Sequence, residues 1–509
     1  MESRLKNSVR NGFWGAFSNV VIILLNFIVR TIFIKVLSEE YLGINGLFTN
    51  ILYILNFAEL GIGNAIVYNL YKPVADNNIE RIKSLVNLYK KIYFYIGLLV
   101  LTLGLLVIPF MKYIIKEPPN ISENIILIYI LYLLETTSTY FLGYKKSILL
   151  VYQKNYITSI INLIFSIIKA IVQVILLLIT KNYLLYLFVY ILSTILSELF
   201  IALYVNKKYQ FLQDKEYIKI SKNEILDIFK NVKSLFLYKL GNTILNGTDN
   251  IILSMLVGIK AVGLYSNYSL IITAVSGVLW NLLSGLTGSI GNLNAYNDKE
   301  KQKNIFNETL FYSSILYGFG MTFIVLLISP FISIWIGNEY LISQITVIFL
   351  VLVCYLRGLE YSTIAYRDSL GLFKYGKYIP LLSSTINIIL SVILGLLIGM
   401  PGIFIASFIS IITTTFWYMP KIIYNKVFET NVFVYLKKVF IFTLPYIISY
   451  ILCSYIFKLF VVNSLVFLII KGILIFFITL IMFLIIENKQ EEFKKLKNRF
   501  SIFFKLKNR

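Results

Sequence analysis

Charged residues recur inside apolar stretches of this sequence, where they could hold charged cargo, exchange ions or pair with one another. A charge near the centre of a bilayer costs about 3 kcal/mol or more, so it normally faces a cavity, water or another charge. The residues concerned are Arg30, Glu59, Glu135, Lys169, Glu198, Asp249, Arg357, Glu360 and Lys471. The bases Arg30, Lys169 and Arg357 suit binding of an anionic group. The acids Glu59, Glu135, Asp249 and Glu360 suit coupling to an ion or gating.

Arg30 and Asp249 are the first candidates to act together. The chain contains a sequence repeat, which places Asn250 at the position that matches Arg30, at an offset of 220. We expect the two positions to face each other across the axis that relates the repeats. Arg30 would then hold an anionic headgroup while Asp249 balances it or binds a coupling cation. An ion pair that closes one gate is the alternative.

Glu135 and Arg357 also match in the repeat, at an offset of 222, so one copy carries an acid where the other carries a base. Glu360 follows Arg357 on the same helical face, one turn later, and a local ion pair is equally consistent with that spacing. Glu59, Lys169 and Glu198 have no evident partner in the sequence. Glu198 is expected near the cytoplasmic end of its span, where water can reach it.

Several kinds of chemistry are excluded by composition. The sequence has no histidine, which excludes His-ligated zinc or haem and Ser-His-Asp catalysis. Its two cysteines, Cys354 and Cys453, lie in apolar runs and are predicted to be core residues. No GxxxxGK[ST] phosphate loop is present. We therefore expect no metal site and no cofactor, apart from a coupling ion, H⁺ or Na⁺.

The overall composition is that of a polytopic membrane protein. Hydrophobic residues make up 58% of the chain and charged residues 14%, with a mean hydropathy of +0.79. Soluble domains have about 25% charged residues. A net charge of +22 would suit nucleic acid, but the lysines and arginines lie in short connectors between apolar runs. Membrane orientation explains them better, and no nucleic-acid partner is expected.

A membrane-spanning helix needs about 20 apolar residues, and the sequence contains fourteen such stretches. They are 13–37, 42–71, 85–111, 121–144, 155–179, 183–205, 234–258, 262–292, 306–335, 341–366, 378–398, 402–424, 439–460 and 464–486. With this count, the connectors assigned to the outside hold only five basic residues: Lys112, Lys116, Lys181, Lys260 and Lys458. The excess of bases on the other side predicts that both termini are cytoplasmic.

The same pattern is written twice along the chain. Leu42-Gly43 aligns with Val262-Gly263 at an offset of 220, as does Asn77 with Asn297, and Tyr144-Lys145 aligns with Tyr366-Arg367 at 222. Six spans separate the copies, so they have the same orientation. Parallel repeats with a site between them are common in transporters.

The repeat divides the chain into predicted domains. These are an N-lobe over 1–205, a cytoplasmic amphipathic linker over 206–233, a C-lobe over 234–424, two further spans over 425–486 and a basic cytoplasmic tail over 487–509. The linker and the tail each alternate apolar with charged residues at helical spacing. We interpret both as helices anchored at the membrane surface, with binding of a partner as the alternative.

Several segments resemble the polysaccharide flippases of the multidrug, oligosaccharidyl-lipid and polysaccharide exporter superfamily. They are Phe13-Trp14-Gly15, the stretch from Tyr41 to Phe48, the stretch from Glu59 to Ala65, the stretch from Thr248 to Leu253, and Val262-Gly263-Leu264-Tyr265. The likeness includes the fourteen-span layout and covers nearly the whole chain.

This resemblance implies an all-α, V-shaped carrier with two lobes in the bacterial cell membrane, functional as a monomer. It would move an undecaprenyl-diphosphate-linked oligosaccharide from the cytoplasmic to the outer leaflet by alternating access, for a capsule or O-antigen type of surface polysaccharide. Polysaccharide polymerases and glycosyltransferases are the expected protein partners. A cationic cavity is typical of such relatives, whereas the acids here roughly balance the bases.

Two other functions remain open from the sequence. A multidrug exporter of the same fold would need acids to dominate the cavity, and the basic residues argue against that. A membrane glycosyltransferase or polymerase would need a large outer loop carrying catalytic residues, but the longest outer connector is about 112–121. We therefore expect a transporter rather than an enzyme.

Overall fold

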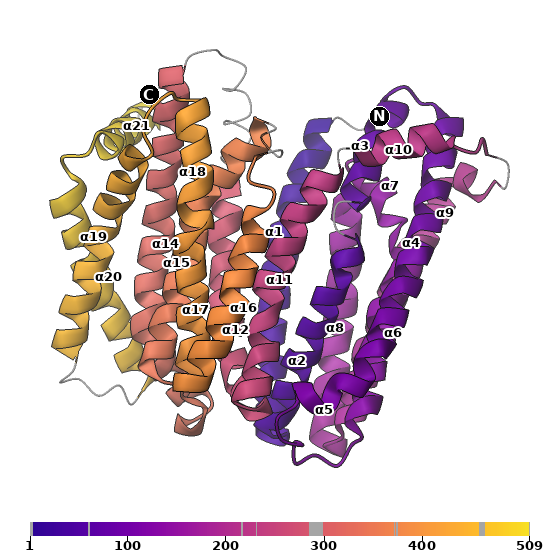
Figure 1. Cartoon of the computed structure of the whole chain (residues 1–509), viewed down its shortest axis with the longest axis horizontal. Coiled ribbons are helices and arrows are strands. Elements are labelled where there is room, and N and C mark those ends of the chain that lie inside the picture. Colours follow the sequence, from indigo (N-terminus) through magenta and orange to yellow (C-terminus); the bar gives the residue numbers. More distant parts are fainter. Residues whose placement is uncertain are drawn as a thin grey trace. The chain divides into compact units, whose positions relative to one another are not determined.

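A computed structural model describes residues 4–59, 62–214, 217–230, 232–284, 299–370, 372, 375–457 and 464–507. All regular secondary structure of these residues is helical, with no strand among them (Figure 1). The chain divides into two compact units, Met1–Gly263 and Leu264–Arg509. Some predictions fall outside the described segments: residues 285–292 and 458–460 of two spans, the residues Leu60 and Gly61, and Lys458 and Asn297.

The first unit contains the following helices: α1 (Arg4–Val36), α2 (Glu39–Leu55), the 3-10 turn η1 (Asn56–Glu59), α3 (Ile62–Ala75), α4 (Ile79–Val107), η2 (Ile108–Phe110), α5 (Met111–Ile114), α6 (Ile125–Gly143), α7 (Lys146–Val151), α8 (Asn155–Thr180), α9 (Tyr183–Lys208), η3 (Gln210–Gln213), α10 (Lys222–Lys230), α11 (Val232–Leu256) and the start of α12 (Ile259–Ser284). Within it, α8 packs against α1 and α9, α6 packs against α4 and α9, and α11 packs against α2.

The second unit continues α12 and adds α14 (Lys299–Trp335), η4 (Asn338–Tyr340), α15 (Gln344–Ser369), α16 (Ile379–Ile398), α17 (Met400–Thr413), α18 (Thr415–Lys426), α19 (Phe433–Ile456), α20 (Leu465–Glu487) and α21 (Glu491–Lys507). Here α15 packs against α14 and α17, while α19 and α20 pack against each other and against α14.

Local sequence explains where the helices begin and end. Asn78, Asn124 and Asn182 cap α4, α6 and α9, because each side chain accepts a hydrogen bond from a backbone amide of the first turn. Gly399 separates α16 from α17 with a φ of +67°, a left-handed conformation that favours glycine, and the next residues are Met400 and Pro401.

Twelve helices of the described chain are long and apolar enough to cross a membrane. The protein is therefore a multi-pass membrane protein. The two other predicted spans are 42–71, which the structure divides into α2, η1 and α3, and 234–258, which is α11. With 17 and 14 residues, α2 and α3 are each short, whereas α11 has 25 residues but is too polar. The total of fourteen spans stays a prediction.

Helix boundaries follow the offset found in the sequence. Two pairs of boundaries are related by the offset of 220: the ends of α1 and α11 (Val36 and Leu256) and the starts of α2 and α12 (Glu39 and Ile259). A repeated layout of complete halves stays a prediction.

Two repeat-related glycines bring the starts of α2 and α12 together. A Cβ atom on Gly43 would collide with the carbonyl oxygen of Ile259, and one on Gly263 would collide with the carbonyl oxygen of Glu39. Ile259 and Glu39 are themselves repeat equivalents, so each helix presents its glycine to the first turn of the other. Such close approach of backbones is how small residues hold helices together in lipid.

Polar contacts surround this crossing. Lys260 forms an ion pair with Glu39, the Tyr41 hydroxyl donates a hydrogen bond to Glu123, and the ammonium of Lys116 donates to the carbonyl oxygen of Leu256 at 2.9 Å. The hydrogen bond from Lys260 holds the pKa of the Glu39 carboxyl below its usual range.

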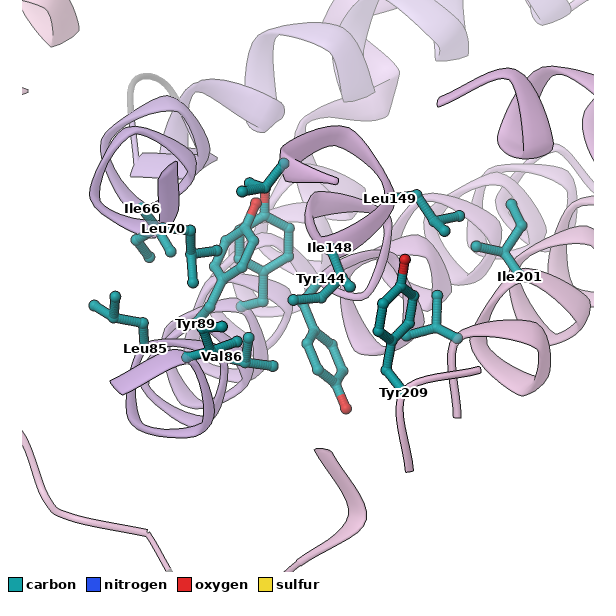
Figure 2. Packing of buried hydrophobic residues seen from close by; sticks show 14 of the residues in the cluster. Ile66, Leu70, Leu85, Val86, Tyr89, Tyr144, Ile148, Leu149, Ile201 and Tyr209 are labelled. Carbon is teal, nitrogen blue, oxygen red and sulfur yellow. The ribbon is translucent and has the colours of Figure 1, made fainter. Parts of the chain in front are cut away.

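A compact core joins α3, α4, α7 and α9 at another part of this unit. Figure 2 shows Leu70 and Tyr89 on one side of it and Leu149, Ile201 and Tyr209 on the other, with Ile148 and Tyr144 between them. The linker helix α10 is held beside this core, because Glu224 pairs with Arg81 at 3.0 Å and Ile228 packs against the core. The amphipathic linker helix α10 therefore packs on α3 and α4 of the protein. Its anchoring at the membrane surface stays a prediction.

The tail helix α21 also docks on the protein. Its Arg499 and Lys495 pair with the buried carboxylate of Glu308 on α14, at 2.5 and 3.4 Å, and its Glu492 pairs with Lys438 on α19. Some charged side chains of the tail therefore form ion pairs with other helices of the second unit. Membrane-surface anchoring by the remainder stays a prediction.

Alanine at Gly43 or Gly263 is expected to separate the starts of α2 and α12. Since the added methyl group would meet backbone rather than a flexible side chain, each substitution should lower the free energy of unfolding by about 1–3 kcal/mol. Thermal unfolding of the purified protein in detergent measures this loss. Gly15→Ala on α1 is the control, because no atom lies within 4 Å of its Cβ position. Equal stability of Gly43→Ala and Gly15→Ala would contradict the tight crossing.

The Glu39 and Lys260 pair should make stability depend on acid pH. Because the pKa of Glu39 is lowered in the folded state, its stabilisation is complete above the unfolded pKa of about 4.3 and is lost as pH falls through the folded pKa. Solvent screening limits the effect to below about 1 kcal/mol. We expect the melting temperature of Glu39→Gln to lie below that of the wild type at neutral pH and to converge with it on acidification. A constant difference across this range would contradict the assignment.

Candidate functional site

Arg30 lies deep in the first unit, among tyrosines from two neighbouring helices. It projects from α1, and its guanidinium interacts electrostatically with Tyr132 of α6 and Tyr186 of α9. The side chain nevertheless keeps part of its surface accessible. A guanidinium placed in this way can donate several hydrogen bonds to a phosphate or carboxylate that reaches it.

Lys169 and Glu135 lie close to each other in the same unit. Lys169 projects from α8 and Glu135 from α6, and the two side chains attract each other electrostatically. The ammonium of Lys169 lies 5.1 Å from the ring centroid of Tyr190 on α9. The Glu135 carboxylate also interacts with the hydroxyls of Tyr190 and Thr194. Lys169, which has no partner evident in the sequence, thus has an acid and an aromatic ring beside it.

Tyrosines connect Arg30 with this pair. The rings of Tyr132 and Tyr190 have centroids 6.3 Å apart, and Tyr186 interacts with both. We call this set the Arg30–Lys169 site: Arg30, Tyr132, Glu135, Lys169, Tyr186, Tyr190 and Thr194. Arg30, Lys169, Tyr186, Tyr190 and Thr194 are partly accessible, whereas Tyr132 and Glu135 are buried. Arginine and lysine side chains can bind an anion, and tyrosine offers ring faces and hydroxyls to a polar ligand.

Glu59 and Asp249 belong to the first unit but lie on other elements. Glu59 ends the η1 turn that divides the second predicted span, and it accepts a hydrogen bond from the hydroxyl of Tyr93. Asp249 is partly accessible on α11, next to Asn250, whose side-chain amide donates to the carbonyl oxygen of Gly46 at 3.4 Å. Their coupling or gating roles stay predictions.

Arg357 and Glu360 lie in the second unit, on α15. Glu360 is buried and interacts electrostatically with Arg357 and Arg367, and its carboxylate also approaches the hydroxyl of Thr415 on α18. Arg357 and Glu360 thus attract each other, as their spacing predicts, and a local ion pair between them stays a prediction. Assignment of Arg357 to substrate and of Glu360 to coupling stays a prediction.

The expectation that Glu198 reaches water is wrong. The residue is 5% exposed and pairs with Lys146 on α7, which is brought to it by the packing of α7 against α9. Lys471 lies over the ring of Phe457 at 5.1 Å.

Sequence reasoning missed the tyrosines of the site. Tyr186, Tyr190 and Thr194 recur at every fourth position and so share one face of α9, a spacing that was available as a signal. It also missed Glu308, whose partners lie almost 200 positions away on α21. Among the described residues, no group of three or more Cys, Asp or Glu side chains could hold a metal ion.

Residues 8–286 match the sequence profile of a family described as polysaccharide biosynthesis protein. The match covers more than half of the 509 residues. The chain belongs to this family. No curated protein matches it. The Arg30–Lys169 site lies entirely within the matched segment.

The fold is similar to those of solved transporters. It is similar to lipid II flippase MurJ in an inward closed conformation, with 17% identity over 95% of this chain and 99% of MurJ and a TM-score of 0.66. An inward-facing multidrug resistance MATE family transporter of the MOP superfamily gives 13% identity over 78% of this chain and 96% of that one, with a TM-score of 0.59. A mutant of the Vibrio cholerae MATE transporter VcmN gives 12% identity over 84% of this chain and 99% of that one, with a TM-score of 0.56.

At these identities the likeness shows a shared fold, not a shared cargo. Together with the family match, it confirms the resemblance found in the sequence at the level of family and fold.

Glu135 and Lys169 should be energetically coupled in this polysaccharide biosynthesis family protein. Glu135→Gln and Lys169→Met should each destabilise the protein, since each leaves one charge without its counter-charge. The double variant should lose less than the sum, with a coupling of about 0.5–3 kcal/mol by thermal or denaturant unfolding. Lys181→Met, at the exposed end of α8, should be additive with Glu135→Gln. Additivity for Lys169→Met as well would contradict the pairing.

Proposed function

We propose that this protein is a flippase for oligosaccharide repeat units linked to undecaprenyl diphosphate. It would carry them from the cytoplasmic to the outer leaflet of the bacterial cell membrane by alternating access, for a capsule or O-antigen type of polysaccharide. The family match and the flippase-like fold support a transport role in polysaccharide biosynthesis. The termini would be cytoplasmic, and the protein would act as a monomer and a transporter rather than an enzyme.

The observation that carries this proposal is the pair of cations, Arg30 and Lys169, on one tyrosine-lined site of a membrane protein of this family. A lipid-linked sugar joined through diphosphate combines a strong anion with polar rings. Arginine and lysine bind phosphate oxygens by charge-assisted hydrogen bonds. Tyrosines beside them supply apolar faces and hydroxyls for sugar. Arg357 would be a further contact of the cargo.

Glu135 limits how tightly the site can hold an anion. Its carboxylate lies beside Lys169 and attracts that ammonium when no cargo is bound. Glu135 would compete with the cargo for Lys169 and so help the cargo to leave. Such help is needed because moving one charge through a membrane potential of 100 mV supplies only about 2.3 kcal/mol to drive release. Glu59, Asp249 and Glu360 would couple transport to H⁺ or Na⁺ or control gating.

A multidrug exporter is the second candidate, since MATE transporters share the fold. An organic cation would need an excess of acid at its site. The Arg30–Lys169 site instead presents two basic side chains beside tyrosines, which suits an anionic cargo.

Arg30→Ala should abolish polysaccharide export without changing protein abundance, because it removes the guanidinium and leaves the apolar faces of α1 intact. The test restores a deletion strain with each variant and measures surface polysaccharide and lipid-linked intermediates. Completed repeat units should accumulate in the inner leaflet. Lys35→Ala, an exposed residue later on α1, is the matched control and should restore export.

Normal export by Arg30→Ala would remove Arg30 from the site. Drug sensitivity of the deletion strain with unaltered polysaccharide would favour the exporter instead.

A further inference from the structure

A cavity of about 690 Å³ lies where α18 passes into α19, and none of the residues assigned above to cargo, coupling or gating lines it. Trp417, Lys421 and Asn425 line one side of it, at every fourth position on a single face of α18. The connecting loop and the first turn of α19 line the other side, through Glu429, Thr430, Asn431, Val432, Phe433 and Leu436. We propose that this cavity, called here the α18–α19 pocket, binds the headgroup of an anionic phospholipid.

Charge in the pocket favours an anion. Lys421 is exposed, and its ammonium lies 5.5 Å from the ring centroid of Trp417, so the ring fixes the cation at the wall of the cavity. The indole of Trp417 is itself oriented by donating to the carbonyl oxygen of Thr413 at 3.0 Å. The acid of the pocket, Glu429, is paired with Lys299 at 2.6 Å and is thereby balanced. One lysine therefore remains in excess.

The first turn of α19 adds backbone donors. The helix is 24 residues long, and no side chain caps it at Val432. Asn431 accepts a hydrogen bond from the amide of Phe433 at 3.0 Å. The other amides at such a helix start favour negative charge. The same loop holds Thr430, whose hydroxyl oxygen is buried and has no hydrogen-bond partner.

The pocket lies at the boundary between apolar and basic segments. From Phe433 onward, α19 is apolar enough to cross the membrane, and Phe433 and Phe440 are 71% and 62% exposed. Lys421 and Lys426 lie in the last turns of α18, and Lys437 lies in the second turn of α19. Aromatic residues mark the level of lipid headgroups, and basic residues mark the cytoplasmic leaflet, which carries the anionic lipid.

This arrangement selects a headgroup rather than a whole lipid. Trp417 and Phe433 are the aromatic residues of the lining, and a glycerol backbone would rest between them. Lys421 and Asn425 then meet a phosphate and its polar substituent. The phosphate could come from a resident phospholipid or from the diphosphate of lipid-linked cargo, and the resident lipid is the proposed occupant because none of the residues assigned to cargo lines the pocket.

Tryptophan fluorescence can test the proposal. In a protein with Trp14, Trp280 and Trp335 replaced by Phe, Trp417 alone reports on the pocket. Reconstitution in nanodiscs of phosphatidylcholine with a minor share of brominated phosphatidylglycerol should quench Trp417 more than the same share of brominated phosphatidylcholine. Lys421→Gln should weaken the preference about fivefold, whereas Lys421→Arg should retain it.

Lys437→Gln is the matched control, since it removes an exposed charge near the pocket without altering its lining. Equal quenching by the two brominated lipids, or equal loss in Lys421→Gln and Lys437→Gln, would overturn the proposal. A competition result would also overturn it: undecaprenyl diphosphate relieves the quenching of Trp417, whereas an equimolar amount of unlabelled phosphatidylglycerol does not. The pocket would then bind the cargo rather than a resident lipid. Because the experiment measures lipid binding, its result does not depend on whether the protein exports polysaccharide.

Discussion

Close approach of two helix backbones, at Gly43 and Gly263, is the constraint on which the arrangement of α2, α11 and α12 depends. Lipid offers no hydrophobic force that would press apolar helices together, so contact area and backbone proximity must hold them. The two glycines are equivalent in the sequence repeat, and each meets the first turn of the other's helix. A reciprocal contact of this kind is the form that two-fold symmetry imposes on an interface. Polar partners such as Glu39 and Lys260 then fix the register at its edge.

The charged residues obey a second constraint, the cost of burying charge in oil. The structure meets it by placing opposite charges near one another: Lys146 forms an ion pair with Glu198, Lys169 attracts Glu135, and Arg357 attracts Glu360. Arg30 is placed among tyrosine hydroxyls and keeps part of its surface accessible. Pairing explains why so many charges are tolerated. At Arg30, the neighbouring tyrosine hydroxyls contribute to the same compensation.

Much of the fold could be predicted because long apolar runs, basic connectors and the repeat offset are all local properties of the sequence. The helix starts at Glu39 and Ile259 follow the repeat for that reason. The division of the second span at Asn56–Glu59 was less accessible, because the neighbouring glycines suit both a bend and close packing. The candidate site was predicted only in part. Arg30, Lys169 and Glu135 stood out as charges, but their grouping depends on how α1, α6, α8 and α9 pack, and Tyr186 and Tyr190 carry no charge to mark them.

The contact between α2 and α11 bears on how the protein is made. These elements belong to the two predicted spans that fall outside the twelve apolar ones, and they pack against each other. Because α11 follows α2 by a long stretch of chain, this contact can form only after the ribosome has made α11. That part of the fold is therefore completed late, when all the helices between the two already exist.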